Sequence, residues 1–199
     1  MTYYLDTRDY NTLNILGSSQ GLPLGFSVWG FIDVHSNQKV SGERFDLSRY
    51  FMEYRLNRAF DPKWFHGARG LGFQAEYNDF NGSRNAVARL GLTYKHGLER
   101  IKNYKGWLRW RVHPYETDGT GWQASVIYSL PITERIGISG FADLNINNGQ
   151  TNRWIVEPQI NIKLNHRFSA VIEYRFNGFE EANSRLSGSG AAFGLGMEL

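Results

Sequence analysis

Residues 154–177 read WIVEPQINIKLNHRFSAVIEYRFN, in which apolar and polar side chains alternate on both sides of a break near Asn165. Ile160 and Ile162, for example, fall on one parity, and Glu157 falls on the other. A period of two places successive side chains on opposite faces of a β-strand, whereas a helix would scatter the same residues around its axis. The stretch therefore predicts two antiparallel strands joined by a short turn.

The same alternation runs through the rest of the chain, interrupted by clusters of Gly, Asn, Ser and Pro that mark turns. Ten segments are well marked, and two shorter, weaker ones precede them. Neither a linker composition nor a helical period divides the sequence, so we predict one domain over residues 1–199, an antiparallel meander. The predicted strands are residues 3–8, 12–18, 24–35, 50–58, 71–78, 88–95, 108–113, 122–130, 136–146, 154–164, 168–177 and 191–199.

Composition excludes several classes of protein. The 199 residues are 41% hydrophobic with a mean hydropathy of −0.45, and no run approaches the roughly 18 apolar residues of a membrane helix, which excludes a helical transporter. Aromatic residues make up 15%, too many for a disordered chain. The sequence has no cysteine, which excludes disulfides and thiol chemistry. Its 22 basic and 19 acidic residues are spread throughout, so we expect no nucleic-acid partner.

Such alternation suits a soluble barrel, with its apolar face inside, or an outer-membrane barrel, with its apolar face toward lipid. Three features favour the membrane barrel. The well-marked strands have about 9 to 11 residues, enough to cross hydrocarbon when tilted. Aromatic residues gather near strand ends, as in interfacial girdles. Short connectors also alternate with long ones, and the long ones include residues 36–48 and 179–189. A soluble, lipocalin-like barrel is the alternative.

We therefore expect an all-β transmembrane barrel of the up-and-down type in a bacterial outer membrane, with lipid as a partner. The first nine residues lack the basic and apolar regions of a signal peptide, so we expect the mature form of an exported protein with an added initiator Met. Ten well-marked strands already close a barrel. The weaker pair at residues 3–8 and 12–18 would make twelve and keep the number even.

Three segments resemble the Tsx-like, nucleoside-specific channel-forming proteins of the bacterial outer membrane. They are GFSVWGFID at 25–33, RYFMEYRL at 49–56, and YSLPITER at 128–135 leading into ISGFAD at 138–143. The resemblance implies a twelve-stranded monomeric barrel that takes up nucleosides by passive diffusion. We therefore predict twelve strands, with ten as the alternative, and nucleosides as the first solute among small polar molecules.

The polar parity supplies candidate residues for a lumen that binds or conducts solute. Charges facing a narrow wet pore create a transverse field, and aromatic faces can stack on a solute that carries a ring. The alternative is a structural or surface-interaction barrel whose lumen is closed by salt bridges and a small internal core. The candidates are Trp29, Phe31, Glu53, Arg55, Arg89, Arg109, Arg111, Phe141, Asp143, Glu157, Glu173 and Arg175.

Pairing across the short turns predicts one row of lumen residues. It sets Arg111 opposite Ser125, Ser125 opposite Phe141, Phe141 opposite Glu157, and Glu157 opposite Glu173. Opposed carboxylates repel, so we expect arginines to compensate them at the narrowest part of the lumen. The same map separates a basic wall from an acidic one: Arg89, Arg109 and Arg111 on the first, and Asp143, Glu157 and Glu173 on the second, with Arg175 diagonal to Glu157.

Catalysis is the least favoured function. His113, Ser125 and Asp143 form the only triad-like constellation, and no oxyanion hole accompanies it. The spacing of the other histidines supports no metal site. We therefore expect a protein that is not an enzyme and that needs neither cofactor nor metal.

Overall fold

The computed structural model describes residues 1–39, 42, 49–66, 69–81, 86–99, 104–118, 121–147, 151–178 and 188–199. Twelve antiparallel strands pair in chain order, and β1 pairs with β12 to close the barrel. This confirms the predicted fold class and favours twelve strands over ten. The strands are β1 (Thr2–Asp6), β2 (Tyr10–Leu22), β3 (Phe26–Asn37), β4 (Arg49–Ala59), β5 (Leu71–Phe80), β6 (Val87–Gly97), β7 (Trp107–Glu116), β8 (Gly121–Pro131), β9 (Ile136–Asn147), β10 (Arg153–Lys163), β11 (Phe168–Asn177) and β12 (Gly188–Met197).

The two segments with the weakest sequence signal are strands of different length. β1 has 5 residues, as expected for a short strand, whereas β2 has 13 and is longer than the predicted range of 12–18. The second half of β2 is rich in glycine and serine, which hides the alternation of apolar and polar side chains. Two 3-10 turns, η1 (Pro23–Gly25) and η2 (Pro62–Phe65), close the β2–β3 and β4–β5 hairpins. No helix of the described chain is long and apolar enough to cross a membrane.

The polar parity faces the inside of the barrel and the apolar parity faces outward. The largest fully buried side chains are polar, and they include Arg111, His113 and Gln74. Large apolar side chains such as Leu92, which is 56% exposed, and Trp110 lie on the outer face. A soluble barrel would place the two parities the other way round, so the lipocalin-like alternative does not fit this structure.

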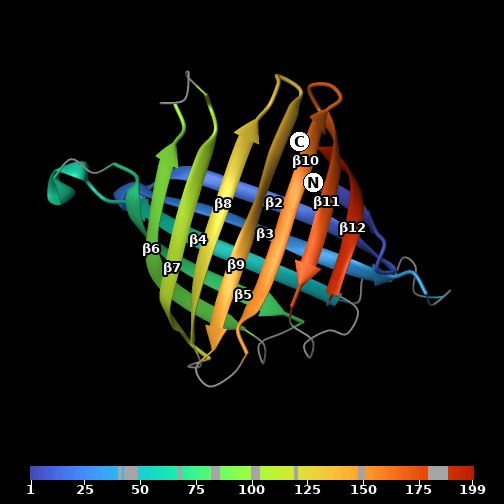
Figure 1. The fold of residues 1–199 in the computed structure, drawn as a ribbon, viewed down its shortest axis with the longest axis horizontal. Coiled ribbons are helices and arrows are strands. Elements are labelled where there is room, and N and C mark those ends of the chain that lie inside the picture. Colours follow the sequence, from blue (N-terminus) through green and yellow to red (C-terminus); the bar gives the residue numbers. More distant parts are fainter. Residues whose placement is uncertain are drawn as a thin grey trace.

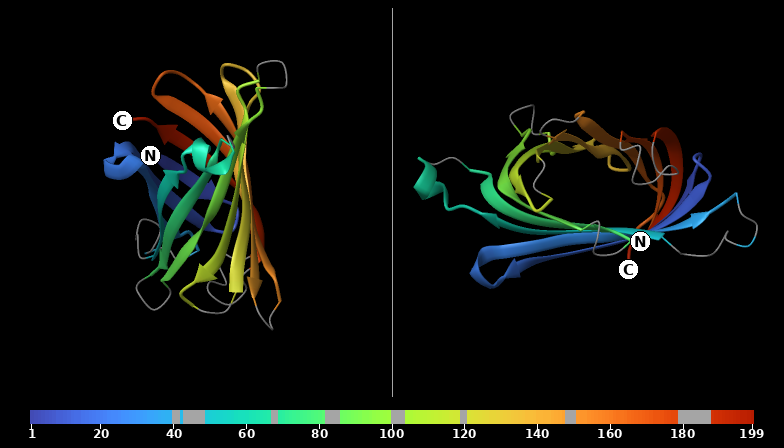
Figure 2. Two further views of the ribbon diagram at one scale, coloured as in Figure 1. Left: turned by 90° about the vertical axis from the view of Figure 1, so that its left-hand side faces the viewer. Right: turned by 90° about the horizontal axis from the view of Figure 1, so that it is seen from below.

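The barrel is asymmetric in the tilt of its strands. In Figure 1, β7 to β11 run nearly up the view, while β2 to β5 form the far wall and run nearly across it. The view along the barrel in Figure 2 shows the curved wall of β6 to β12 facing this flatter wall. The β8–β9 and β10–β11 turns are short and lie at the same end as both termini, where the backbone nitrogen of Met197 donates to the carbonyl oxygen of Met1 at 2.7 Å. Most of the connectors predicted at 36–48 and 179–189 lie outside the described residues.

A β-bulge between β6 and β7 changes which side chains face the lumen. Leu90 pairs with Tyr115 and Leu92 with Val112, so Gly91 lies opposite two residues of β7. One of them is Pro114, which has no N–H to donate and is tolerated at a bulge. A Cβ at Gly91 would lie 2.1 Å from the carbonyl oxygen of Val112, so only glycine fits. The bulge sets Arg89 opposite Glu116, and both point inward.

Candidate functional site: the barrel lumen

The first polar cluster of the lumen is organised around Glu76 on β5. Its Oε2 accepts from Arg55 Nε at 3.1 Å and from Arg111 Nη1 at 3.0 Å, and its Oε1 accepts from Arg89 Nη1 at 3.1 Å. These arginines come from β4, β7 and β6, so strands on both sides of β5 supply the partners of one carboxylate. We call this set, together with Glu53, Glu116 and Asp143, the Glu76 network.

Further carboxylates complete the Glu76 network. Arg89 Nε donates to Glu116 Oε2 at 2.9 Å, Arg111 Nη2 donates to Asp143 Oδ1 at 3.2 Å, and Arg55 also pairs with Glu53. Arg111 is 1% exposed, and most of its partners in this ion-pair system are also buried. Buried charges are tolerated only when they are paired and hydrogen-bonded, which explains the density of the network.

His113 lies in the same region but is not part of a catalytic triad. Its Nδ1 is 3.2 Å from Gln123 Oε1, and its Nε2 is 3.0 Å from Gln74 Nε2. The hydroxyl of Ser125 donates to Gln123 Oε1 at 3.4 Å, while Asp143 binds Arg111. The hydrogen bonds of a hydrolase triad are therefore not formed between His113, Ser125 and Asp143.

A second polar cluster lies where the barrel closes, and we call it the Arg175 network. Arg175 pairs with Glu173 on its own strand and with Asp6 at 3.5 Å, and it donates to Thr12 Oγ1 at 3.3 Å. Asp6 also binds Arg8 at 2.9 Å. Thr12 Oγ1 contacts His35 Nδ1 at 2.9 Å. This network joins β11 to β1, β2 and β3, so polar contacts inside the lumen reinforce the closing seam.

The predicted row of lumen residues is correct at two pairs and wrong at two. Arg111 lies opposite Ser125 and Phe141 lies opposite Glu157, as expected. Ser125, however, lies opposite Asp143 rather than Phe141, and Glu173 lies opposite Gln159 rather than Glu157. Both errors are shifts of two residues that originate in the turns.

The local structure of the β8–β9 and β10–β11 turns explains the two shifts. Pro131 does not break β8 but is its last residue, paired with Gly137. In the next turn, Asn165 Oδ1 accepts from the backbone nitrogens of Arg167 and Phe168 at 2.8 and 2.9 Å, which centres the turn one residue later than predicted. The pairs Val156–Phe176 and Gln159–Glu173 then place Glu157 in register with Arg175. Glu157 and Glu173 are therefore diagonal neighbours rather than directly opposed residues.

The predicted separation into a basic and an acidic wall is also wrong. Arg89 binds Glu76 on the adjacent strand β5, and Arg111 reaches Asp143 two strands away on β9, so opposite charges interleave around the lumen. Arg109 differs, because no carboxylate of the described chain forms an ion pair with it. Its guanidinium lies 5.8 Å from the ring centroid of Trp107, and the ammonium of its cross-strand partner Lys95 lies 4.6 Å from the same ring.

Two of the three aromatic side chains predicted for the lumen, Trp29 and Phe31, lie together on one wall. Trp29 contacts Phe31 edge-on at 5.4 Å between ring centroids, and Phe31 contacts Phe51 at 5.6 Å. The guanidinium of Arg55 lies 4.5 Å from the Trp29 ring centroid, which connects this cluster to the Glu76 network. Phe141 shares the lumen parity but lies on β9, between Ile127 and Glu157 of the neighbouring strands.

Several residues that organise the lumen are absent from the predicted set. Glu76 and Gln74 fall on the polar parity of residues 71–78, so their inward direction was available from the sequence. Lys95 and Trp107 carry the same signal on β6 and β7. The sequence does not show which of these side chains forms the centre of a network. The centre depends on how the strands approach one another, and the parity of a residue does not predict that approach.

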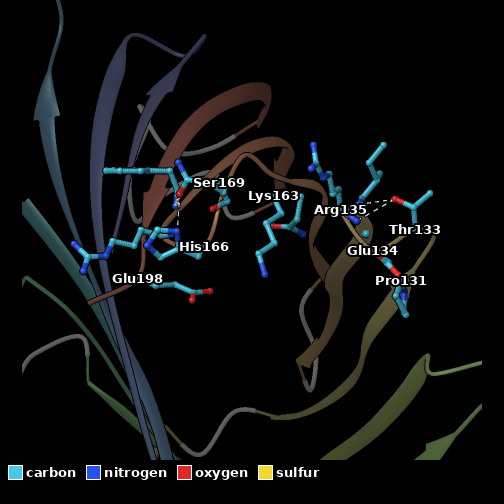
Figure 3. A pocket seen from close by; sticks show the side chains of 14 residues that line it. Pro131, Thr133, Glu134, Arg135, Lys163, His166, Ser169 and Glu198 are labelled. Atoms are coloured by element: carbon cyan, nitrogen blue, oxygen red, sulfur yellow. Dashed lines mark hydrogen bonds between the residues drawn. The ribbon is translucent and has the colours of Figure 1, made fainter.

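A cavity of about 350 Å³ lies at the short-turn end of the barrel. Figure 3 shows side chains of the β8–β9 and β10–β11 turns around it, including Arg135, Lys163 and His166, together with Glu198. The cavity marks a mouth of the barrel and is separate from both buried networks. The described chain contains no group of three or more His, Cys, Asp or Glu side chains placed to hold a metal ion.

Comparisons with known proteins support the fold. No family model and no curated protein sequence matches the chain. Two solved structures are similar: "KdgM porin", with a TM-score of 0.60 and 10% identity, and "KdgM porin in complex with disordered oligogalacturonate", with a TM-score of 0.59 and 11% identity. Each alignment covers 100% of this chain and 96% of the porin chain. At this identity the likeness shows a shared barrel fold.

Proposed function

We propose that this protein is an outer-membrane channel, monomeric and not an enzyme, through which small polar solutes diffuse passively. The inverted distribution of side chains carries the proposal, because a closed barrel with apolar residues outside and charged residues inside is stable only with lipid around it. The closed fold shared with KdgM porins supports the same function.

The side chains along the aromatic wall favour a solute that has a flat ring and polar groups. Trp29 and Phe31 offer ring faces or edges, and the guanidinium of Arg55 lies over the Trp29 ring. Nucleosides have both features and agree with the Tsx-like resemblance of the sequence, so they are the first solute to test. Oligogalacturonate is bound by one of the similar porins, and acidic sugars are therefore the comparison solute.

A structural barrel with a closed lumen is the second candidate, and one observation favours it. Arg111 and His113 are 1% and 0% exposed, so side chains fill the lumen around them. A small barrel can be plugged in this way by its own interior residues. An open channel would have a continuous water path beside the Glu76 network, and a closed barrel would have none.

Conductance in a planar bilayer separates the two candidates. The refolded protein, verified by a heat-dependent change in gel mobility, should produce discrete openings that added adenosine partly blocks. A channel must bind its solute weakly enough to release it, so block should require nucleoside at roughly millimolar rather than nanomolar concentration. Silence at high protein content in a verified barrel would favour the closed lumen. Block by oligogalacturonate alone would retain the channel and replace the solute.

We expect Lys95 and Arg109 to give an open pore a preference for anions. They are cross-strand neighbours over Trp107, and within the described chain neither of them forms an ion pair. Changing both residues to glutamine should shift the reversal potential in a KCl gradient toward cation selectivity. Arg58→Gln is the matched control, because Arg58 lies on the outer face against Phe26 and should leave the reversal potential unchanged. Equal shifts in both variants would place the selectivity outside the lumen.

A further inference from the structure

The tips of the β2–β3 and β4–β5 hairpins expose large apolar side chains that have no role in the lumen. Leu24 in η1 is 77% exposed and Trp64 in η2 is 68% exposed. Phe65 is also exposed, and its ring stacks on Phe60 at 5.2 Å between centroids. Isolated exposed apolar residues are common on protein surfaces, but these belong to two neighbouring hairpins and concentrate at their tips.

The backbone at Leu24 is conformationally strained. Its φ of 62° lies in the left-handed region, which a branched residue such as leucine adopts only at a cost that glycine or asparagine largely avoids. The turn therefore combines a strained backbone with an apolar side chain that contacts little of the protein. Both costs are offset if the Leu24 side chain inserts into an apolar phase outside the molecule.

Local hydrogen bonds hold the η2 tip. The side chain of Asp61 accepts from the backbone nitrogen of Lys63 at 2.9 Å, and the backbone nitrogen of Trp64 donates to the Asp61 carbonyl oxygen at 3.0 Å. These bonds, together with the stacked Phe65 ring, fix the turn that holds Trp64 outward. Trp64 is thus presented by ordered structure and is not the accidental exposure of a loose loop.

Both tips extend sideways from the barrel. Figure 1 and the view along the barrel in Figure 2 show η1 and η2 on the same side, beyond the ring of strands, because β2 to β5 run so nearly across the axis. The outward face leading to the tips continues the apolar exterior through Phe26 and Leu56 and carries Arg58 over Phe26 at 5.5 Å. Lys63 adds a second exposed cation at the η2 tip.

We propose that η1 and η2 form a lipid-binding surface that lies in the headgroup region of the phospholipid leaflet at the short-turn end of the barrel. Tryptophan prefers this interface, leucine reaches the adjoining acyl chains, and Arg58 and Lys63 match the charge of lipid phosphates. The inference rests on the proposed membrane location. In addition to its aromatic girdle, the barrel is anchored in one leaflet by two lateral hairpins.

Depth measurements with single spin labels test this surface, and the absence of native cysteine makes each label unique. The variants are Leu24→Cys and Trp64→Cys at the tips, Leu92→Cys on the outer face of β6, and Glu134→Cys in the β8–β9 turn at the same end. Each is refolded into vesicles of phosphatidylethanolamine and phosphatidylglycerol. Accessibility to oxygen, which concentrates in lipid, is then compared with accessibility to a water-soluble nickel chelate.

Labels at 24 and 64 should be more accessible to oxygen than to nickel, at depths between the label at 92, deep in lipid, and the label at 134, in water. Nickel accessibility at the tips equal to that at 134, with 92 still in lipid, would overturn the lipid-binding surface and leave the membrane barrel intact. Exclusion of both reagents at the tips would indicate cover by protein and would also overturn it. A label at 92 that lies in water would reject the membrane location itself.

Leu24→Asn checks whether the tip has a purely structural role. Asparagine adopts the left-handed conformation more readily, so the variant should unfold in detergent at the same denaturant concentration as the wild type or a higher one. In vesicles, a label at Trp64→Cys in the Leu24→Asn background should move toward water. A loss of stability in detergent with no change in depth would instead show that Leu24 supports the fold alone.

Discussion

Arg111→Ala should destabilise the barrel by about 3–5 kcal/mol, because it leaves the buried Asp143 without its cation and removes one of the three arginines that pair with Glu76. Arg111 bridges Glu76 at 3.0 Å and Asp143 at 3.2 Å and is almost completely buried. The free energy of unfolding can be measured by guanidinium titration of the protein in detergent micelles, with tryptophan fluorescence and the heat-dependent gel shift as two readouts.

Arg109→Ala provides the matched control. Arg109 is two residues away on the same strand and the same parity, but it contacts Trp107 and forms no ion pair with a carboxylate of the described chain. Loss of this cation–π contact should cost about 1 kcal/mol or less. If both variants lost equal stability, the Glu76 network would not be the main electrostatic support of the lumen.

Gly91→Ala should be comparably harmful for a steric reason. The added Cβ would lie 2.1 Å from the carbonyl oxygen of Val112 and 2.6 Å from the His113 ring, and the backbone of the bulge cannot move without breaking its pairing. We expect a loss of about 3 kcal/mol or more, at the upper end of single substitutions. The same guanidinium titration measures it.

Gly137→Ala is the control for the bulge. The nearest atom to its added Cβ is the carbonyl oxygen of Leu130 at 3.7 Å, an ordinary van der Waals distance. The substitution should change stability by no more than about 0.5 kcal/mol. A Gly91 variant as stable as the Gly137 variant would mean that the β6–β7 bulge can shift its register.

Period-two alternation predicted the strands and their two faces, because side-chain direction in a strand depends only on position along the chain. Strand length and aromatic positions were needed to choose the membrane barrel. Register was less predictable, since it depends on local turn chemistry. Pro131 ends a strand instead of breaking it, and the side chain of Asn165 moves the centre of its turn by one residue. A one-residue error in a turn changes every cross-strand pair beyond it by two.

The lumen candidates illustrate the same division. Arg111 and Asp143 were assigned correctly to the interior, but their direct ion pair depends on a register that was predicted wrongly. Glu76 was not among the candidates, although it accepts from arginines on three other strands. Such a centre is a property of the assembled wall. The sequence of residues 71–78 shows a carboxylate on the polar parity but does not show that three arginines converge on it.

The short β1 strand has a consequence for how the molecule assembles. Of the twelve strand pairings formed by the described residues, eleven join neighbours in sequence, and the pairing of β1 with β12 brings the two ends of the chain together. That pairing has five residue pairs, half the ten between β11 and β12. Hairpins form from local contacts and loop closure over the whole chain is slow, so the ring should close last. Before β1 pairs with β12 and Asp6 contacts Arg175 in the lumen, the protein is a curled sheet with two open edges.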